Sequence, residues 1–205
     1  MTKYSQIAMI DILTPRSIEY YQKLRKMGVN DAIIRLSTSN YSSYFEIASI
    51  HTDLAKRSGM RVHASLATDL TNPFHDARYF FATYQRLGYS FGSKTMIQCL
   101  PDDRVKDPAK RLHELLGYIS YFVNKDDIDI AVDKRYIDEN RLKIADIPDY
   151  FNLTIINVNK LNSGIDRAGT WIYTDNFEGE LQYLGYDYYG FYTKEGYQLS
   201  LDAEY

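Results

Sequence analysis

Apolar and polar positions follow a repeating order along the first three quarters of the chain. Short apolar runs alternate with longer segments whose apolar residues recur every three to four positions, the spacing of an amphipathic helix. This pattern predicts strands at 7–12, 32–37, 60–67, 94–100, 128–132 and 153–158, and helices at 16–27, 44–58, 73–87, 108–124 and 135–142. Strands separated by helices are typical of a parallel sheet built from β-α-β units.

Turn-forming residues mark several of these boundaries. Gly28, Gly59 and Gly88 each follow a predicted helix, and glycine commonly ends helices. At the other end of the first helix, Thr14 suits the N-cap and Pro15 suits the first helical position.

The pattern changes after residue 159, where two further strands are predicted at 170–174 and 182–193 with a turn at 175–179. We expect this segment to return beside the first strand and close the sheet. The sequence therefore predicts one α/β domain over residues 1–205, an irregular β/α barrel with a β-rich C-terminal closing segment. An open doubly wound sheet is the alternative, but no Gly-rich phosphate-binding turn follows any predicted strand.

Charge and composition limit the classes of binding partner and the cellular locations that can be expected for the protein. The net charge is −3 and no basic run occurs, which argues against a nucleic-acid partner. No apolar window approaches the roughly 20 residues of a membrane span. The first residues lack the pattern of a signal peptide, so a cytoplasmic location and release by lysis or another non-classical route both stay open. The 20 tyrosines suit a sugar-binding groove, because each pairs an apolar ring with a polar tip.

Metal and redox chemistry have little support in the sequence. Cys99 is the only cysteine, lies in an apolar run and is expected to be a buried hydrophobic residue. The four histidines show no metal-ligand spacing, so we expect neither a metal nor a cofactor.

Two carboxylates stand out in apolar surroundings. Asp11 ends the first predicted strand, and Asp187 lies among tyrosines in the last one. Reactive residues of a β/α barrel stand at the C-terminal ends of its strands. If the first and last strands are neighbours, the two carboxylates could share one pocket, and a pair of carboxylates is what glycoside hydrolysis uses.

Taken together, several segments resemble glycoside hydrolase family 25, the Chalaropsis-type lysozymes or N-acetylmuramidases. The segments that carry the resemblance are 8–12, 28–35, 55–64, 169–174 and 185–189. The resemblance implies a groove for peptidoglycan and cleavage of β-1,4 bonds between N-acetylmuramic acid and N-acetylglucosamine, with no metal or cofactor. It places Asp11 and Asp187 at acid positions, and it implies substrate contacts from Arg35, Trp171, Tyr173, Tyr186 and Tyr189.

The chain departs from this family where the chemistry is expected. The family's fourth strand ends in Asp-x-Glu, and its Glu is the expected general acid. Here the pair appears as Gln98 and Leu100, or as Cys99 and Pro101 if the alignment slides by one residue. None of these side chains can take the place of the catalytic acid. In addition, Ala-Ser-Leu-Ala at 64–67 replaces the family's Ala-Tyr-His-Phe, and Thr154 replaces a tryptophan.

Three hypotheses follow. The leading one is a muramidase-like domain, catalytically impaired, that recognises cell-wall glycan or a protein partner. The second is an active lysozyme with rearranged acids, for which Asp69, Asp102 and Asp103 are candidates because they follow the third and fourth strands. The third is an interaction protein on this fold, in a bacteriocin or phage setting, which an exposed apolar patch away from the groove would favour.

Overall fold

The computed structural model describes residues 5–10, 15–39, 45–89 and 92–193. Eight strands form a closed barrel in the order in which they occur along the chain. Strands β1 to β7 pair in parallel, and β8 is antiparallel to both of its neighbours, β7 and β1. The strands are β1 (Ser5–Ile10), β2 (Val29–Thr38), β3 (Arg61–Thr68), β4 (Thr95–Cys99), β5 (Ile128–Asp133), β6 (Asn152–Ile156), β7 (Thr170–Phe177) and β8 (Glu180–Asp187). The predicted fold class is confirmed.

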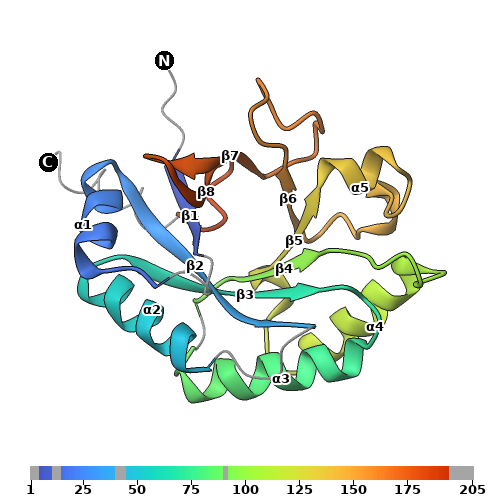
Figure 1. The fold of residues 1–205 in the computed structure, drawn as a ribbon. Helices are drawn as coiled ribbons and strands as arrows, with labels where there is room; N and C mark the ends of the chain where they lie inside the picture. The colour runs from blue at the N-terminus through green and yellow to red at the C-terminus, as the bar shows by residue number, and fades with distance from the viewer. Residues whose placement is uncertain (1–4, 11–14, 40–44, 90–91, 194–205) are drawn as a thin grey trace, which may run out of the picture.

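Helices cover only part of the outside of this barrel. Figure 1 shows α1 to α4 arranged along β1 to β4, whereas α5 is short and stands beside β5. The helices are α1 (Ile18–Lys26), α2 (Phe45–Arg57), α3 (Pro73–Arg86), α4 (Pro108–Ile119) and α5 (Lys134–Asp138), with short 3-10 turns η1 (Lys125–Asp127) and η2 (Ile144–Asp146). Among the described residues no helix follows β6, β7 or β8, so the outer wall there consists of side chains and loops.

Local sequence signals account for most of the helix ends. The three glycines predicted to end helices have positive φ angles, +89° at Gly28, +78° at Gly59 and +67° at Gly88, which side chains rarely adopt. The start of α1 differs from the prediction. The helix begins at Ile18 with Ser17 as its N-cap, so Pro15 precedes it, and Thr14 lies outside the described residues.

Two apolar layers hold the barrel together. Side chains that alternate along the strands fill the interior, while the opposite faces pack against the helices. The interior cluster consists of Ile7, Met9, Ile33, Met96, Ala131, Ile156, Ile172 and Tyr192. The outer layer includes Leu24, Phe80, Leu112 and Leu115 from the helices, and it contains Cys99, which is buried as expected. Every helix in the described residues is too short or too polar to cross a bilayer.

Candidate functional site

The C-terminal ends of β2, β3 and β4 surround a hollow of about 420 Å³, which we call the mouth. In a β/α barrel this is the end that carries the reactive groups. The residues that line the mouth are Arg35, Thr38, Ser39, Ala67, Thr68, Asp69, Leu100, Pro101, Asp102, Asp103, Tyr136 and Arg141.

Arg35 lines the mouth from β2. The guanidinium of Arg35 donates through Nη2 to the side-chain oxygen of Gln98, and through Nε to the hydroxyl of Ser65 at 3.3 Å. Leu100 follows β4, and its backbone N–H donates to the Thr68 carbonyl at 2.8 Å. The end of the fourth strand therefore carries Gln98, which is bonded to Arg35, and Leu100, which lines the mouth, and neither side chain can act as a general acid or base.

Asp102 lines the mouth but is already paired. Its carboxylate accepts from the backbone N–H of Arg104 at 2.8 Å and from two guanidinium nitrogens of the same residue at 2.7 and 3.0 Å. These bonds lower the pKa of Asp102 to about 2. At neutral pH the group has no proton to give, so it does not meet the requirement for a general acid.

Asp69 and Asp103 are also engaged. Oδ1 of Asp69 accepts from the backbone N–H and the hydroxyl of Thr71, at 2.8 and 2.6 Å, in a local turn. Asp103 forms an ion pair of 2.8 Å with Arg141. The structure thus gathers all three predicted loop acids around one hollow, and each of them already has a partner.

A further acid beneath the mouth was not predicted. Asp76 lies in the first turn of α3 and is buried, and its Oδ2 accepts from the hydroxyls of Ser39 and Thr68, both at 2.7 Å. Burial raises the pKa of Asp76, and the two hydroxyl bonds oppose that rise. The sequence signal for Asp76 is an acidic residue in a first helical turn, which is indistinguishable from ordinary helix capping.

Asp187 lies at the other end of the barrel. In the antiparallel register of β1 and β8, Asp187 is opposite Ser5 and Tyr183 is opposite Met9. Asp187 is therefore level with the start of β1, whereas Asp11 follows Ile10 at its end and lies outside the described residues. This register gives no support to a pocket shared by both carboxylates, because an antiparallel strand ends where its neighbour begins.

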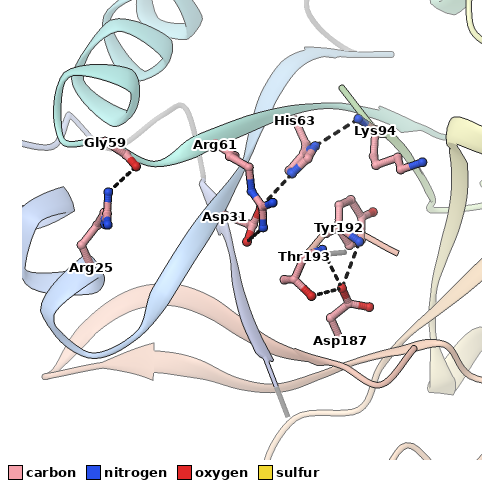
Figure 2. Close-up of polar contacts among 9 residues, drawn as sticks. All are labelled: Arg25, Asp31, Gly59, Arg61, His63, Lys94, Asp187, Tyr192 and Thr193. Atoms are coloured by element: carbon pink, nitrogen blue, oxygen red, sulfur yellow. Dashed lines mark hydrogen bonds and ion pairs between the residues drawn. The ribbon is translucent and has the colours of Figure 1, made fainter. Parts of the chain in front are cut away.

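The carboxylate of Asp187 holds the chain that follows it. It accepts from the backbone N–H groups of Tyr192 and Thr193 at 2.9 and 3.1 Å and from the Thr193 hydroxyl at 3.0 Å (Figure 2). It also accepts from the backbone N–H of Phe191 at 3.0 Å. These bonds bend residues 188–193 back, so the strand predicted to reach residue 193 ends at Asp187. Burial raises the pKa of Asp187, and the bonds from Tyr192 and Thr193 oppose that rise.

Asp129 forms the centre of a buried polar cluster at the same end. Its carboxylate accepts from the hydroxyls of Tyr192 and Thr154 at 2.5 and 2.6 Å and from the Asn152 amide at 2.9 Å. Burial raises the pKa of Asp129 to about 6 against the effect of these bonds, and the nearby charge of Asp187 raises it further. Thr154, at the position of the family's tryptophan, thus donates a hydrogen bond to this carboxylate.

His63 belongs to the same buried end, beside Tyr192 (Figure 2). Its Nδ1 accepts from the backbone N–H of Lys94 at 3.0 Å, so Nε2 carries the proton and donates to Asp31 at 3.1 Å. Asp31 also accepts two bonds from Arg61, at 2.8 and 2.9 Å. Every donor and acceptor described here is satisfied within the protein, which indicates a structural closure of the barrel rather than a reactive site.

The aromatic residues predicted to contact substrate lie away from the mouth. Trp171, Tyr173 and Tyr186 are on the outer faces of β7 and β8. The rings of Tyr173 and Tyr186 stack with centroids 4.4 Å apart, and Trp171 lies 5.9 Å from Tyr186. Tyr189 is 73% exposed on the same wall. Of the five predicted substrate contacts, the structure places only Arg35 at the mouth.

Solved structures with this barrel are lysozymes and related enzymes. The catalytic domain of a Listeria monocytogenes bacteriophage endolysin superimposes with a TM-score of 0.74 at 12% identity, over 95% of this chain and 98% of that one. A family 25 glycosyl hydrolase from Bacillus anthracis gives 0.69 at 14% identity, over 92% and 91%. The fold is that of the family 25 glycoside hydrolases. A modular autolysin from Streptococcus pneumoniae, in complex with a synthetic peptidoglycan ligand, gives 0.71 at 14% identity over 88% of this chain and 46% of that one.

The family 25 likeness is one of fold. No protein-family model matches the sequence. No curated protein matches it either. Within the described residues, no three His, Cys, Asp or Glu side chains are placed to hold a metal ion. The family 25 barrel is thus present, and the polar groups that the described residues place at its mouth are two arginines, hydroxyls and carboxylates already paired.

Proposed function

We propose that this chain is a lysozyme-like domain that recognises cell-wall glycan and has little or no glycosidase activity. The observation that carries the proposal is the pair at the end of β4, where Gln98 accepts a bond from Arg35 and Leu100 lines the mouth. General acid–base groups typically contribute about 10² to 10⁴ in rate each. The described residues give the mouth no usable proton donor, which favours binding over cleavage.

The mouth retains groups suited to a sugar chain. Arg35 has a guanidinium group, Thr38 a hydroxyl and Tyr136 a ring at the mouth. Sugar hydroxyls donate and accept hydrogen bonds, and the stem peptides of peptidoglycan carry carboxylates that guanidinium groups bind well. The solved autolysin with a bound peptidoglycan ligand supports this choice of ligand class.

An active lysozyme with rearranged acids is the second candidate. It is favoured by one observation, that Asp69, Asp102 and Asp103 line the same hollow as Arg35. It ranks second because Asp102 is held ionised by Arg104, Asp69 accepts from Thr71, and Asp103 pairs with Arg141.

One experiment separates the two candidates. Purified Gram-positive peptidoglycan is incubated with the protein, and both the release of reducing ends and the amount of protein that co-sediments are measured, with an active muramidase as reference. We expect co-sedimentation without release. Arg35→Ala should weaken co-sedimentation about tenfold, whereas Arg57→Ala, on the exposed face of α2, should leave it unchanged.

Two outcomes would contradict the proposal. Release of reducing ends that disappears in Asp69→Asn or Asp102→Asn would establish the second candidate. Absence of co-sedimentation by the intact protein would contradict glycan recognition and would favour a protein partner.

A further inference from the structure

A second hollow, of about 610 Å³, lies on the outer wall of the barrel, and we call it the wall pocket. It is bounded by the loop at 161–168 on one side and by β7 and the end of β8 on the other. Four aromatic rings line it, those of Trp171, Tyr186, Tyr188 and Tyr189. None of the residues that line the wall pocket lines the mouth. Its volume is within the range of small-molecule sites, about 300 to 1,000 Å³.

Hydrogen bonds hold the loop of the wall pocket in place. The side-chain amide of Asn157 donates to the backbone carbonyls of Asn162 and Ser163, both at 3.2 Å. The indole N–H of Trp171 in turn donates to the carbonyl of Asn157 at 3.0 Å. The loop is thus tied to the floor of the pocket, and a ligand would not have to order it on binding.

The other end of the loop is anchored as well. The guanidinium of Arg167 donates to the carbonyls of Ile147 and Pro148, at 2.9 and 2.6 Å, in the segment that precedes β6. Oδ1 of Asn162 accepts from the backbone N–H of Gly164 at 2.9 Å, which orients that amide at the rim. The loop is therefore a fixed frame that carries two exposed side chains, Leu161 at 98% exposure and Asp166.

The side chains that line the wall pocket indicate which class of ligand it can bind. Among the described residues that line the wall pocket there is no lysine, arginine or histidine to pair with a phosphate or carboxylate group. Tyr189 offers an exposed ring. Asp166 is an exposed carboxylate for which the described part of the chain provides no hydrogen bond or ion pair. An exposed ring suits the apolar face of a sugar, and a carboxylate accepts from two of its hydroxyls.

We propose that the wall pocket binds the pyranose ring of an uncharged glycan, with Tyr189 stacking on the ring and Asp166 accepting from its hydroxyls. The inference is independent of the function proposed for the mouth, because the two hollows share no residue. A protein that used both would hold one glycan network at two points, which raises its apparent affinity without any new contact.

The chain contains a reporter for this site. Trp171 is its only tryptophan, and it lines the wall pocket. The full chain is titrated with N,N′,N″-triacetylchitotriose while tryptophan emission is followed, and the same titration is repeated by calorimetry. We expect a saturable change in emission with a matching heat. Tyr189→Ala and Asp166→Asn should each raise the Kd at least about tenfold.

Matched variants make the result specific. Tyr121→Ala removes a tyrosine that is 89% exposed beyond the end of α4, and Asp53→Asn neutralises an exposed carboxylate on α2, outside both hollows. Both should leave the Kd for the trisaccharide unchanged, and thermal melts of all variants verify folding. Absence of both signals with the intact chain would overturn the proposal. So would a Kd that is unaffected by Tyr189→Ala and Asp166→Asn, or one that is lost in Arg35→Ala, which would place the sugar at the mouth.

Discussion

Arg35 on β2 donates a hydrogen bond to the side-chain oxygen of Gln98 on β4, across the intervening strand β3. The bond joins a permanent cation to a neutral acceptor in a half-buried setting. The mouth therefore contains a position at which a carboxylate would be electrostatically favoured, and the chain places an amide there.

Replacement of that amide tests the electrostatics of the mouth. Gln98→Glu keeps the acceptor and adds a negative charge beside Arg35, and charge-assisted bonds are roughly twice as strong as neutral ones. We expect the free energy of unfolding to rise by about 0.5 to 1 kcal/mol at low salt and the gain to shrink at high salt. Urea denaturation at two salt concentrations measures this, with Gln98→Leu as the control without an acceptor. A gain that does not depend on salt would contradict the assignment.

Asp187 is expected to be structural. An asparagine has one acceptor oxygen in place of two, so Asp187→Asn leaves some of the N–H groups of residues 191–193 unpaired. We expect the free energy of unfolding to fall by about 1 to 3 kcal/mol and residues 188–193 to become more sensitive to protease. Asp175→Asn on neighbouring β7 is the control. Unchanged stability together with loss of a hydrolytic activity would instead assign Asp187 a catalytic role.

Asp129 makes stability depend on pH. Burial raises its pKa to about 6 from an ordinary value of 3.8, so the folded protein binds this proton more tightly than the unfolded chain does. Its stabilising contribution is complete below about pH 4 and is lost as the pH rises through about 6. The free energy of unfolding of the wild type relative to Asp129→Asn should therefore fall by about 2 kcal/mol between pH 4 and pH 7.

Denaturation curves at pH 4, 5, 6 and 7 measure that difference. Asp53→Asn, on the exposed face of α2, provides the control and should show no comparable change. A difference that rises with pH would contradict the direction of the shift in the pKa of Asp129.

The hydroxyl of Tyr192 is expected to stabilise the ionised form of Asp129. Tyr192→Phe removes the bond of 2.5 Å and leaves the buried carboxylate with the donors from Thr154 and Asn152. The expected loss is about 1 to 3 kcal/mol at pH 7 and less at pH 4, where the carboxyl group is protonated. Denaturation at both pH values measures it, and Tyr121→Phe on the surface should have no effect. An equal loss at both pH values would mean that the hydroxyl does not act on the charge.

The order of strands and helices could be predicted because its signals are local. Apolar spacing and glycines such as Gly28 and Gly59 mark each element without reference to the rest of the chain. The end of β8 could not be predicted in this way, because the tyrosine-rich segment 188–192 has the composition of a strand. The hydrogen bonds to the carboxylate of Asp187 show that the backbone turns there.

The candidate site was predicted less well, for a geometric reason. Closure of the barrel places the strand of Asp187 beside β1. The direction of β8 then decides which end of β1 lies level with Asp187. A similar limit applies to Trp171 and Tyr186. The sequence shows that side chains alternate between the two faces of β7 and β8, but it does not show which face points out of the barrel. Asp76 was missed because its partners come from the C-terminal ends of two other elements, Ser39 directly after β2 and Thr68 at the end of β3.

The pairing of β1 with β8 has a consequence for how the chain folds. Residues 5–9 find their partners at 183–187, almost the whole described chain away. During synthesis β1 can pair with β2 early, but its other edge stays open until the last strand has been made. Contacts so distant in sequence slow folding, and an unpaired edge invites pairing with other chains. Until β8 has been synthesised, the nascent chain is therefore expected to depend on chaperones that cover the open edge of β1.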